Sequence, residues 1–160
     1  MQFPVEISSE NYLSRRKKSN MKKEAELGGT AEEQKGKEGA EDSFSELKLN
    51  KNSQRNLVSA TSDDSLKEIF RKIKTSKFPA VINYGASWCG VCSQILPTFR
   101  ELSGKFPKLS FVYADIDECP ETTRHIRYTP TFHFYRDGER VDEMFGVGEE
   151  RLQDRLWLHS

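Results

Sequence analysis

Two cysteines separated by two residues, Cys89 and Cys92, are the residues of this 160-residue chain whose types and spacing most clearly indicate chemistry. They stand in the stretch NYGASWCGVCSQILP, residues 83–97, between an apolar run and a helical pattern. A helix N-terminus offers unpaired N–H groups and about half a positive charge, both of which stabilise a thiolate. The position therefore predicts that Cys89 attacks a disulfide and that Cys92, one helical turn further on, resolves the mixed disulfide. Gly90 leaves the approach to the sulfurs open.

Other interpretations of the pair stay open at this point. Two free cysteines can pack as small hydrophobic side chains, and a metal site would need further ligands. Cys119 and His125 are the nearby candidates, and the sequence holds no second C-x-x-C, so a four-ligand zinc site has little support. We expect His133 to be an ordinary surface or sheet side chain. Cys119 is expected to be an inert surface or half-buried thiol, with regulatory oxidation or dimer formation as its alternative.

The elements that must position the pair are predicted from hydrophobic spacing in the last hundred residues. Helices are expected at residues 63–75, from the cysteine loop to about residue 105, briefly over residues 119–126, and at the C-terminus, where Leu152, Leu156 and Trp157 share one face. Strands are expected at residues 80–84 and 109–114, with an additional edge strand within residues 55–60. Asp137-Gly138 lies between two β-rich runs and predicts a hairpin. Pro97 falls inside the second helix and should kink it.

This order of elements predicts an α/β fold with a central mixed sheet of four to five strands flanked by helices. The domain is expected to occupy residues 54–160. Residues 1–53 are expected to form a disordered, charged extension, because a stretch such as MKKEAELGGTAEEQKGKEGAED has almost nothing to bury.

Composition narrows the functional classes. The formal net charge is zero, and no run of 18 apolar residues is present, so neither a nucleic-acid partner nor a membrane span is expected. A basic cluster within residues 15–23 is interpreted as a solvated tail, with a nuclear or nucleic-acid patch as the alternative. The first twenty residues lack an apolar signal core, and three cysteines without one favour a reducing compartment. The expected location is the cytoplasm, with the plastid or the nucleus as alternatives.

The sequence resembles the thioredoxin family over roughly residues 56–160. Trp88-Cys89-Gly90-Val91-Cys92 is similar to the family's Trp-Cys-Gly-Pro-Cys active site, and within the family it looks most like an atypical plant group with valine at the fourth position. Pro97 falls where the family kinks its active-site helix, and Thr129-Pro130-Thr131 resembles the family's cis-proline loop. Asp137-Gly138 and Gly146 match its hairpin turn and a late glycine.

The resemblance implies roles for individual residues. A cis Pro130 would place the Thr129 backbone beside the cysteines, where an extended substrate segment can add as a strand. Trp88 would shield the site and offer an apolar surface to the substrate. Thr129, Pro130 and Trp88 are thus the expected substrate-binding residues, and Cys89–Cys92 is the expected redox-active disulfide. No metal and no bound cofactor are expected.

Two departures from the family pattern bear on mechanism. Asn83 stands where the family usually has a buried aspartate that helps to move the proton of the second cysteine, and an amide cannot act as a base near neutral pH. Resolution by Cys92 is therefore expected to be slower, or to run through water. Val91 replaces a proline and restores an N–H close to the sulfurs. The reduction potential is expected to lie above the roughly −270 mV of thioredoxin.

The predicted function is a thiol–disulfide oxidoreductase, an enzyme that reduces or exchanges protein disulfides. Its expected partners are disulfide-containing proteins and an electron donor such as a thioredoxin reductase or the glutathione system. It is expected to act as a monomer. Two alternatives stay open: a thioredoxin-like binding scaffold with weak redox activity, and a dimer that holds an iron–sulfur cluster through the first cysteine.

Overall fold

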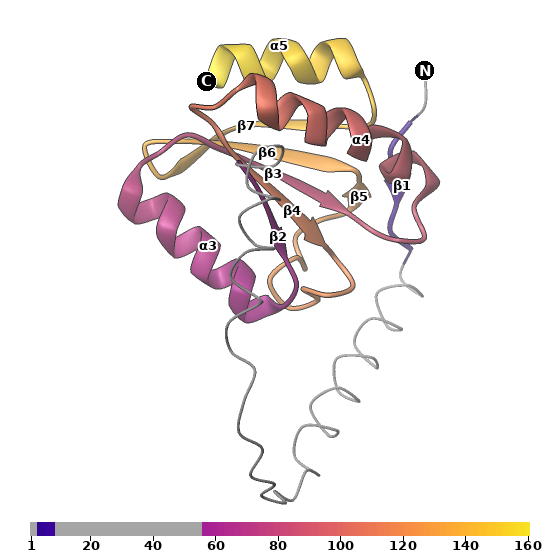
Figure 1. The fold of residues 1–160 in the computed structure, drawn as a ribbon. Helices are drawn as coiled ribbons and strands as arrows, with labels where there is room; N and C mark the ends of the chain where they lie inside the picture. Colours follow the sequence, from indigo (N-terminus) through magenta and orange to yellow (C-terminus); the bar gives the residue numbers. More distant parts are fainter. Residues whose placement is uncertain (1–2, 9–55) are drawn as a thin grey trace, which may run out of the picture.

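The computed structural model describes residues 3–8 and 56–160, and the account of the structure concerns these residues (Figure 1). Two expectations concern residues outside these ranges: the disorder of residues 1–53, apart from residues 3–8, and the role of the basic cluster within residues 15–23. No helix in the described ranges is both long and apolar enough to cross a membrane.

The centre of the domain is a five-stranded mixed sheet, as predicted. Its strand order is β2-β4-β3-β6-β7. The bounds are β2 Leu57–Ala60, β3 Ala80–Gly85, β4 Ser110–Asp115, β6 Thr131–Arg136 and β7 Glu139–Phe145. Strands β2 and β3 are parallel to β4, β6 is antiparallel to β3, and β7 is antiparallel to β6. The predicted edge strand is thus β2.

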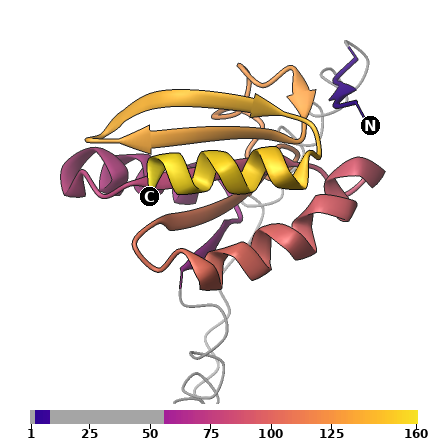
Figure 2. The ribbon, with the colours of Figure 1, turned by 90° about the horizontal axis from the view of Figure 1, so that it is seen from above.

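Three helices cover the two faces of this sheet. Helix α3 (Asp63–Ser76) lies on one face, and helices α4 (Gly90–Lys105) and α5 (Glu149–His159) lie on the other (Figures 1 and 2). Alternate residues of β3 point to opposite faces: Ile82 and Tyr84 join the core beneath α3, whereas Val81 joins the core beneath α4 and α5. All six residues of β3 are buried, which explains why this strand appears in the sequence as a continuous apolar run.

Local signals set the bounds of α3 and of the hairpin. Ser62 caps α3 in a reciprocal capping box with Ser65, and Lys77, the C-cap residue after the helix, adopts a left-handed backbone conformation. In the hairpin, Asp137 and Gly138 have φ values of 54° and 84°, the pair of positive angles that a tight two-residue β-turn requires. A Cβ on Gly138 would lie 3.1 Å from the backbone oxygen of Lys74, so both backbone angle and space favour glycine.

The short helix predicted over residues 119–126 is wrong, because these residues form turns. Backbone bonds of helical type join Cys119 to Asp115 and Thr123 to Cys119, but the pattern does not continue. A side chain from α3 competes for the donors in between: Asp63 Oδ1 accepts bonds from the backbone N–H groups of Glu121 and Thr122 at 3.0 and 2.7 Å. This external acceptor replaces the carbonyls that a helix would use.

Trp157 does not share the buried face of α5, so that part of the prediction is wrong as well. Leu152 and Leu156, four residues apart, are fully buried, and His159 completes their face at 8% exposure. Trp157 follows Leu156 directly, about 100° around the helix, and is 73% exposed. The prediction assigned Trp157 to the buried face because its side chain is apolar, but residues i and i+1 of a helix point in different directions.

The expectation of disorder also fails for residues 3–8. Strand β1 (Val5–Glu6) pairs antiparallel with the short strand β5 (Tyr128–Thr129) as a separate two-stranded sheet. Figure 1 shows β1 beside β5, near the start of α4. Val5, Glu6 and Ile7 alternate apolar and charged residues, which is the pattern of a short strand. A prediction based on the composition of the whole extension does not detect it.

Candidate active site

The two cysteines lie where the central strand meets a helix. Strand β3 ends at Gly85, Cys89 is the N-cap residue of α4, and Cys92 lies in the first turn of that helix. Their sulfurs form a disulfide, and the two Cα atoms are 5.3 Å apart. The pairing expected from the sequence is therefore present, in the strand–loop–helix setting that was predicted.

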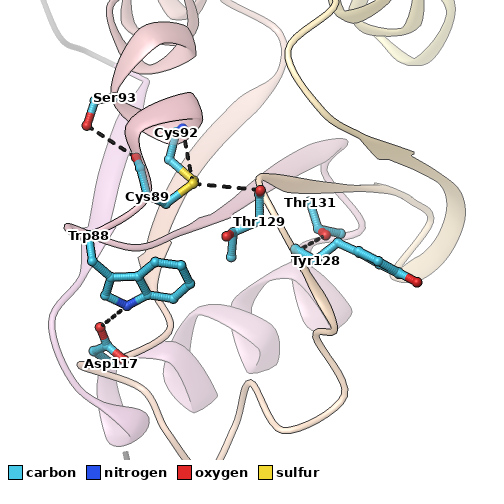
Figure 3. Close-up of a disulfide and its surroundings, with 8 residues drawn as sticks. All are labelled: Trp88, Cys89, Cys92, Ser93, Asp117, Tyr128, Thr129 and Thr131. Carbon is cyan, nitrogen blue, oxygen red and sulfur yellow. Dashed lines mark hydrogen bonds between the residues drawn. A yellow bond between two sulfur atoms is a disulfide. The ribbon is translucent and has the colours of Figure 1, made fainter. Parts of the chain in front are cut away.

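The helix start directs polar hydrogens at Cys89. The backbone N–H of Cys92 donates to Cys89 Sγ at 3.2 Å, so a sulfur takes the place that a serine or aspartate oxygen usually holds in an N-cap (Figure 3). The N–H groups of Gly90 and Val91 belong to the same first turn, where a helix leaves its donors without internal partners. These donors and the helix dipole favour a negative charge on this sulfur in the reduced state.

A second backbone segment lies against the same sulfur. The peptide bond from Thr129 to Pro130 is cis, and the backbone oxygen of Thr129 is 3.7 Å from Cys89 Sγ (Figure 3). Thr131 Oγ1 donates to the backbone oxygen of Tyr128 at 2.5 Å, and Gly146 N–H donates to that of Pro130 at 3.1 Å. These bonds hold the loop on the end of β6, so its position beside the cysteine is fixed by the sheet.

Trp88 directly precedes Cys89 and is 42% exposed, so it is not a purely core tryptophan. Its indole Nε1 donates to Asp117 Oδ2 at 2.8 Å, which fixes the ring at the end of β4 (Figure 3). Asp117 is a site residue that the sequence analysis missed. The signal was the segment DIDE after a strand, because parallel neighbours such as β3 and β4 bring their carboxyl ends to the same edge.

Both sulfurs are buried in this structure. Cys89 is 1% and Cys92 4% exposed, and both belong to the apolar cluster beneath α3. Open space surrounds Gly90, since an added Cβ would meet nothing within 4 Å. The approach expected at Gly90 is thus open, while the side chain of Cys89 itself is covered.

Asn83 lies within β3 and is 1% exposed. Its Oδ1 has no hydrogen-bond partner among the described residues. A buried amide can accept or donate bonds but cannot take up a proton near neutral pH, so this position offers no base.

Two of the histidines lie in one group of rings with Tyr84. His133 is a sheet side chain, 1% exposed, whose ring nitrogen Nε2 is 2.6 Å from Glu143 Oε2. Burial lowers its pKa to about 4, although the bond to Glu143 acts in the opposite direction. Its ring stacks on that of His125, and Tyr84 meets both edge-on. His133 and Tyr84 are buried, whereas His125 is exposed. The expectation of an ordinary sheet position missed this cluster of rings.

Cys119 is fully buried, outside the disulfide, with its sulfur 3.8 Å from the backbone oxygen of Ala60. The expected surface or half-buried position is therefore wrong. Within the described parts of the chain, no group of three or more His, Cys, Asp or Glu side chains is arranged to hold a metal ion.

Comparison with known proteins gives a consistent result. The family model described as Thioredoxin matches residues 58–157. The chain is 68% identical over 124 residues, 78% of this chain and 98% of the relative, to Thioredoxin-like 3-3 of Arabidopsis thaliana. It is 69% identical over 114 residues, 71% of this chain and 88% of the relative, to Thioredoxin-like 3-3 of Oryza sativa subsp. japonica. Among solved structures, thioredoxin of Schistosoma mansoni superposes with a TM-score of 0.61 at 31% identity, covering 68% of this chain and 100% of that one.

Proposed function

The chain belongs to the thioredoxin family, and we propose that it reduces or exchanges disulfides in protein substrates through Cys89 and Cys92. Family and fold support a thiol–disulfide oxidoreductase role in general. The observation that carries the specific proposal is the setting of Cys89 Sγ. It accepts the N–H of Cys92 at a helix start, is bonded to Cys92, and lies 3.7 Å from the peptide oxygen before a cis proline.

The first step forms a mixed disulfide. The Cys89 thiolate attacks one sulfur of a substrate disulfide along the S–S axis, a bond forms between Cys89 Sγ and that sulfur, and the other substrate sulfur leaves as a thiolate. The first-turn N–H groups of α4 stabilise the thiolate before attack. The backbone edge of Thr129 can pair with the substrate on either side of its cysteine and thereby orient the reacting sulfur.

The second step releases the substrate. Cys92 loses its proton to solvent, because Asn83 offers no base, and its thiolate attacks Cys89 Sγ. The bond between Cys89 and the substrate breaks, the second substrate thiolate leaves, and the Cys89–Cys92 disulfide seen in the structure forms. Two electrons have passed to the substrate. A separate two-electron donor, either a thioredoxin reductase or two molecules of glutathione, then reduces the disulfide and returns both cysteines to the thiol state.

The test is turnover of a protein disulfide. With dithiothreitol as electron source and insulin as substrate, the wild-type chain should accelerate precipitation of the insulin B chain. Cys89→Ser should abolish the acceleration, because the attacking sulfur is gone. Cys119→Ser serves as the matched control, since it removes a cysteine that lies outside the disulfide, and it should leave the rate unchanged.

The partner cysteine gives an independent measurement. Cys92→Ser should accumulate a mixed disulfide between Cys89 and the substrate, visible by mass spectrometry and removed by excess dithiothreitol. If the wild-type chain gives no more insulin reduction than Cys89→Ser, and Cys92→Ser traps nothing, the chain is a binding scaffold rather than an oxidoreductase.

A further inference from the structure

The N-terminal strand lies on the backbone edge that the proposed substrate needs. In the pairing of β1 with β5, Val5 is opposite Thr129 and Glu6 is opposite Tyr128. Thr129 is also the residue whose peptide oxygen is 3.7 Å from Cys89 Sγ. A segment of this chain and an incoming substrate strand would therefore pair with the same residue.

The hydrogen bonds of this short ladder fix its type. Ile7 N–H donates to the backbone oxygen of Arg127 at 2.8 Å. In an antiparallel pair, opposite residues alternate between those that exchange N–H···O bonds and those that do not. Ile7 and Arg127 are a hydrogen-bonded pair, and Val5 and Thr129 lie two residues further along the ladder. Val5 and Thr129 are therefore a hydrogen-bonded pair as well. The backbone edge of Thr129 that a substrate strand would use is thus already paired with Val5 of the same chain.

Side chains add apolar contact to this pairing. Val5 and Ile7 are half-buried against the cluster that contains Cys89 and Cys92, while Glu6 between them is exposed. The alternation is that of a strand with one face on the core. The attacking sulfur, which a substrate must reach, is 1% exposed in the same structure.

We propose that residues 3–8 form a tethered strand which occupies the substrate edge of β5, so that the chain limits access to its own Cys89. The kind of partner that this edge fits follows from its present occupant: an extended protein segment with β-branched apolar residues at alternate positions, as in Val5-Glu6-Ile7. The substrate part of this inference rests on the proposed function; the masking of the sulfur does not. The strand lies outside the matched family domain, which begins at residue 58.

The masking is tested by the rate at which iodoacetamide alkylates Cys89 in the reduced full-length chain, followed at each cysteine by mass spectrometry. Val5→Asp places a charge against the apolar cluster and should release the strand. Phe3→Asp is the matched control, because it adds the same charge in the same segment at a side chain that is 78% exposed. We expect Val5→Asp to raise the alkylation rate about threefold or more, and Phe3→Asp to leave it at the wild-type value.

Cys119 reports whether the variant is folded, because it is fully buried in the core. If Val5→Asp also exposes Cys119 to alkylation, Ile7→Asp takes its place as the releasing variant. Equal Cys89 rates in the folded releasing variant and in Phe3→Asp would overturn the proposal.

Insulin reduction then separates masking from function. When only a fraction of the molecules is open, the apparent affinity for substrate equals the affinity of the open form multiplied by that fraction. Release of the strand should therefore lower KM by the same factor by which it raises the alkylation rate, with kcat unchanged. Faster alkylation without turnover in any variant would leave masking in place and refute the proposed function. Faster alkylation with active enzyme and unchanged KM would show that the strand covers the sulfur but not the substrate edge, and would overturn that half of the proposal.

Discussion

Replacing Val91 with proline should make the Cys89–Cys92 couple more reducing. Val91 lies between the two cysteines in the first turn of α4, where Cys92 N–H already donates to Cys89 Sγ at 3.2 Å. Proline is tolerated in the first turn of a helix, so the fold should persist, but it has no N–H. The change therefore removes one of the donors that favour the thiolate, and with it part of the stability of the reduced state.

The magnitude follows from the geometry. The N–H of Val91 belongs to the turn that caps the sulfur, but the bond to Sγ in the structure comes from Cys92, so we assign the lost donor about 1 kcal/mol, the value of an ordinary hydrogen bond. For a two-electron couple, 1.4 kcal/mol corresponds to roughly 30 mV, so Val91→Pro should lower the potential by about 20 mV. The wild-type value should lie above the roughly −270 mV of thioredoxin.

The assay is a redox titration in dithiothreitol or glutathione buffers, with the oxidised fraction read from alkylated species by mass spectrometry. Val91→Ala is the matched control, because it removes most of the half-buried side chain but keeps the N–H. Its potential should stay within roughly 5 mV of the wild-type value. A Val91→Pro potential equal to or above that of Val91→Ala would refute the role of the N–H. A wild-type potential at or below about −270 mV would refute the comparison with thioredoxin.

Three further predictions concern proton transfer and stability. Asn83→Asp should accelerate release of the trapped substrate by Cys92 at neutral pH, measured by quenched flow, because it supplies a base; an unchanged rate would contradict this reasoning. Asp63→Ala should cost about 2–4 kcal/mol in the free energy of unfolding by urea, since Asp63 Oδ1 accepts three bonds at 2.7–3.0 Å, whereas Asp63→Asn keeps an oxygen and should lose less than half as much. His133 is neutral at pH 7 because burial lowers its pKa to about 4. The unfolded chain binds that proton more readily, so stability should fall by about 3 kcal/mol between roughly pH 6.5 and pH 4, and His133→Phe should flatten this part of the profile.

The sequence predicted most of the domain because its local signals agree with its packing. The strand at residues 80–85 is apolar throughout since both of its faces are buried, and Asp137-Gly138 supplies the backbone angles that the hairpin needs. The cysteine loop was predictable for the same reason: an apolar run before Cys89 and a helical pattern after Cys92 place the pair between a strand and a helix.

The wrong helix over residues 119–126 and the missed Asp117 both arise where a distant residue decides local structure. Residues 119–126 have a composition that allows a helix, but the carboxylate of Asp63, more than fifty residues earlier, takes their backbone donors. The contact of Trp88 with Asp117 likewise joins two loops that are neighbours only because β3 and β4 are parallel. Periodicity within one element carries no information about such bonds.

Strand β1 is a further case in which a distant contact decides local structure, here by forming a strand where none was predicted. Val5 and Ile7 lie in a segment whose composition predicts no core, and two residues cannot form a stable strand alone. Their partner is the open edge at Thr129, which exists only after the cis proline loop has folded onto β6. A binding edge in a folded domain can therefore order a segment that the sequence alone assigns to a tail.

The three unusual features of this chain bear on different steps of the proposed cycle, and this makes them separable. Release of β1 should change access to Cys89 in alkylation and KM by one common factor. Val91→Pro should change the stability of the thiolate, and hence the potential. Asn83→Asp should act on the second step, where Cys92 must lose a proton before it attacks. If a β1 variant altered the potential as strongly as Val91→Pro, the strand would have to bind the oxidised and reduced states differently, and masking would then depend on the redox state of the pair that it covers.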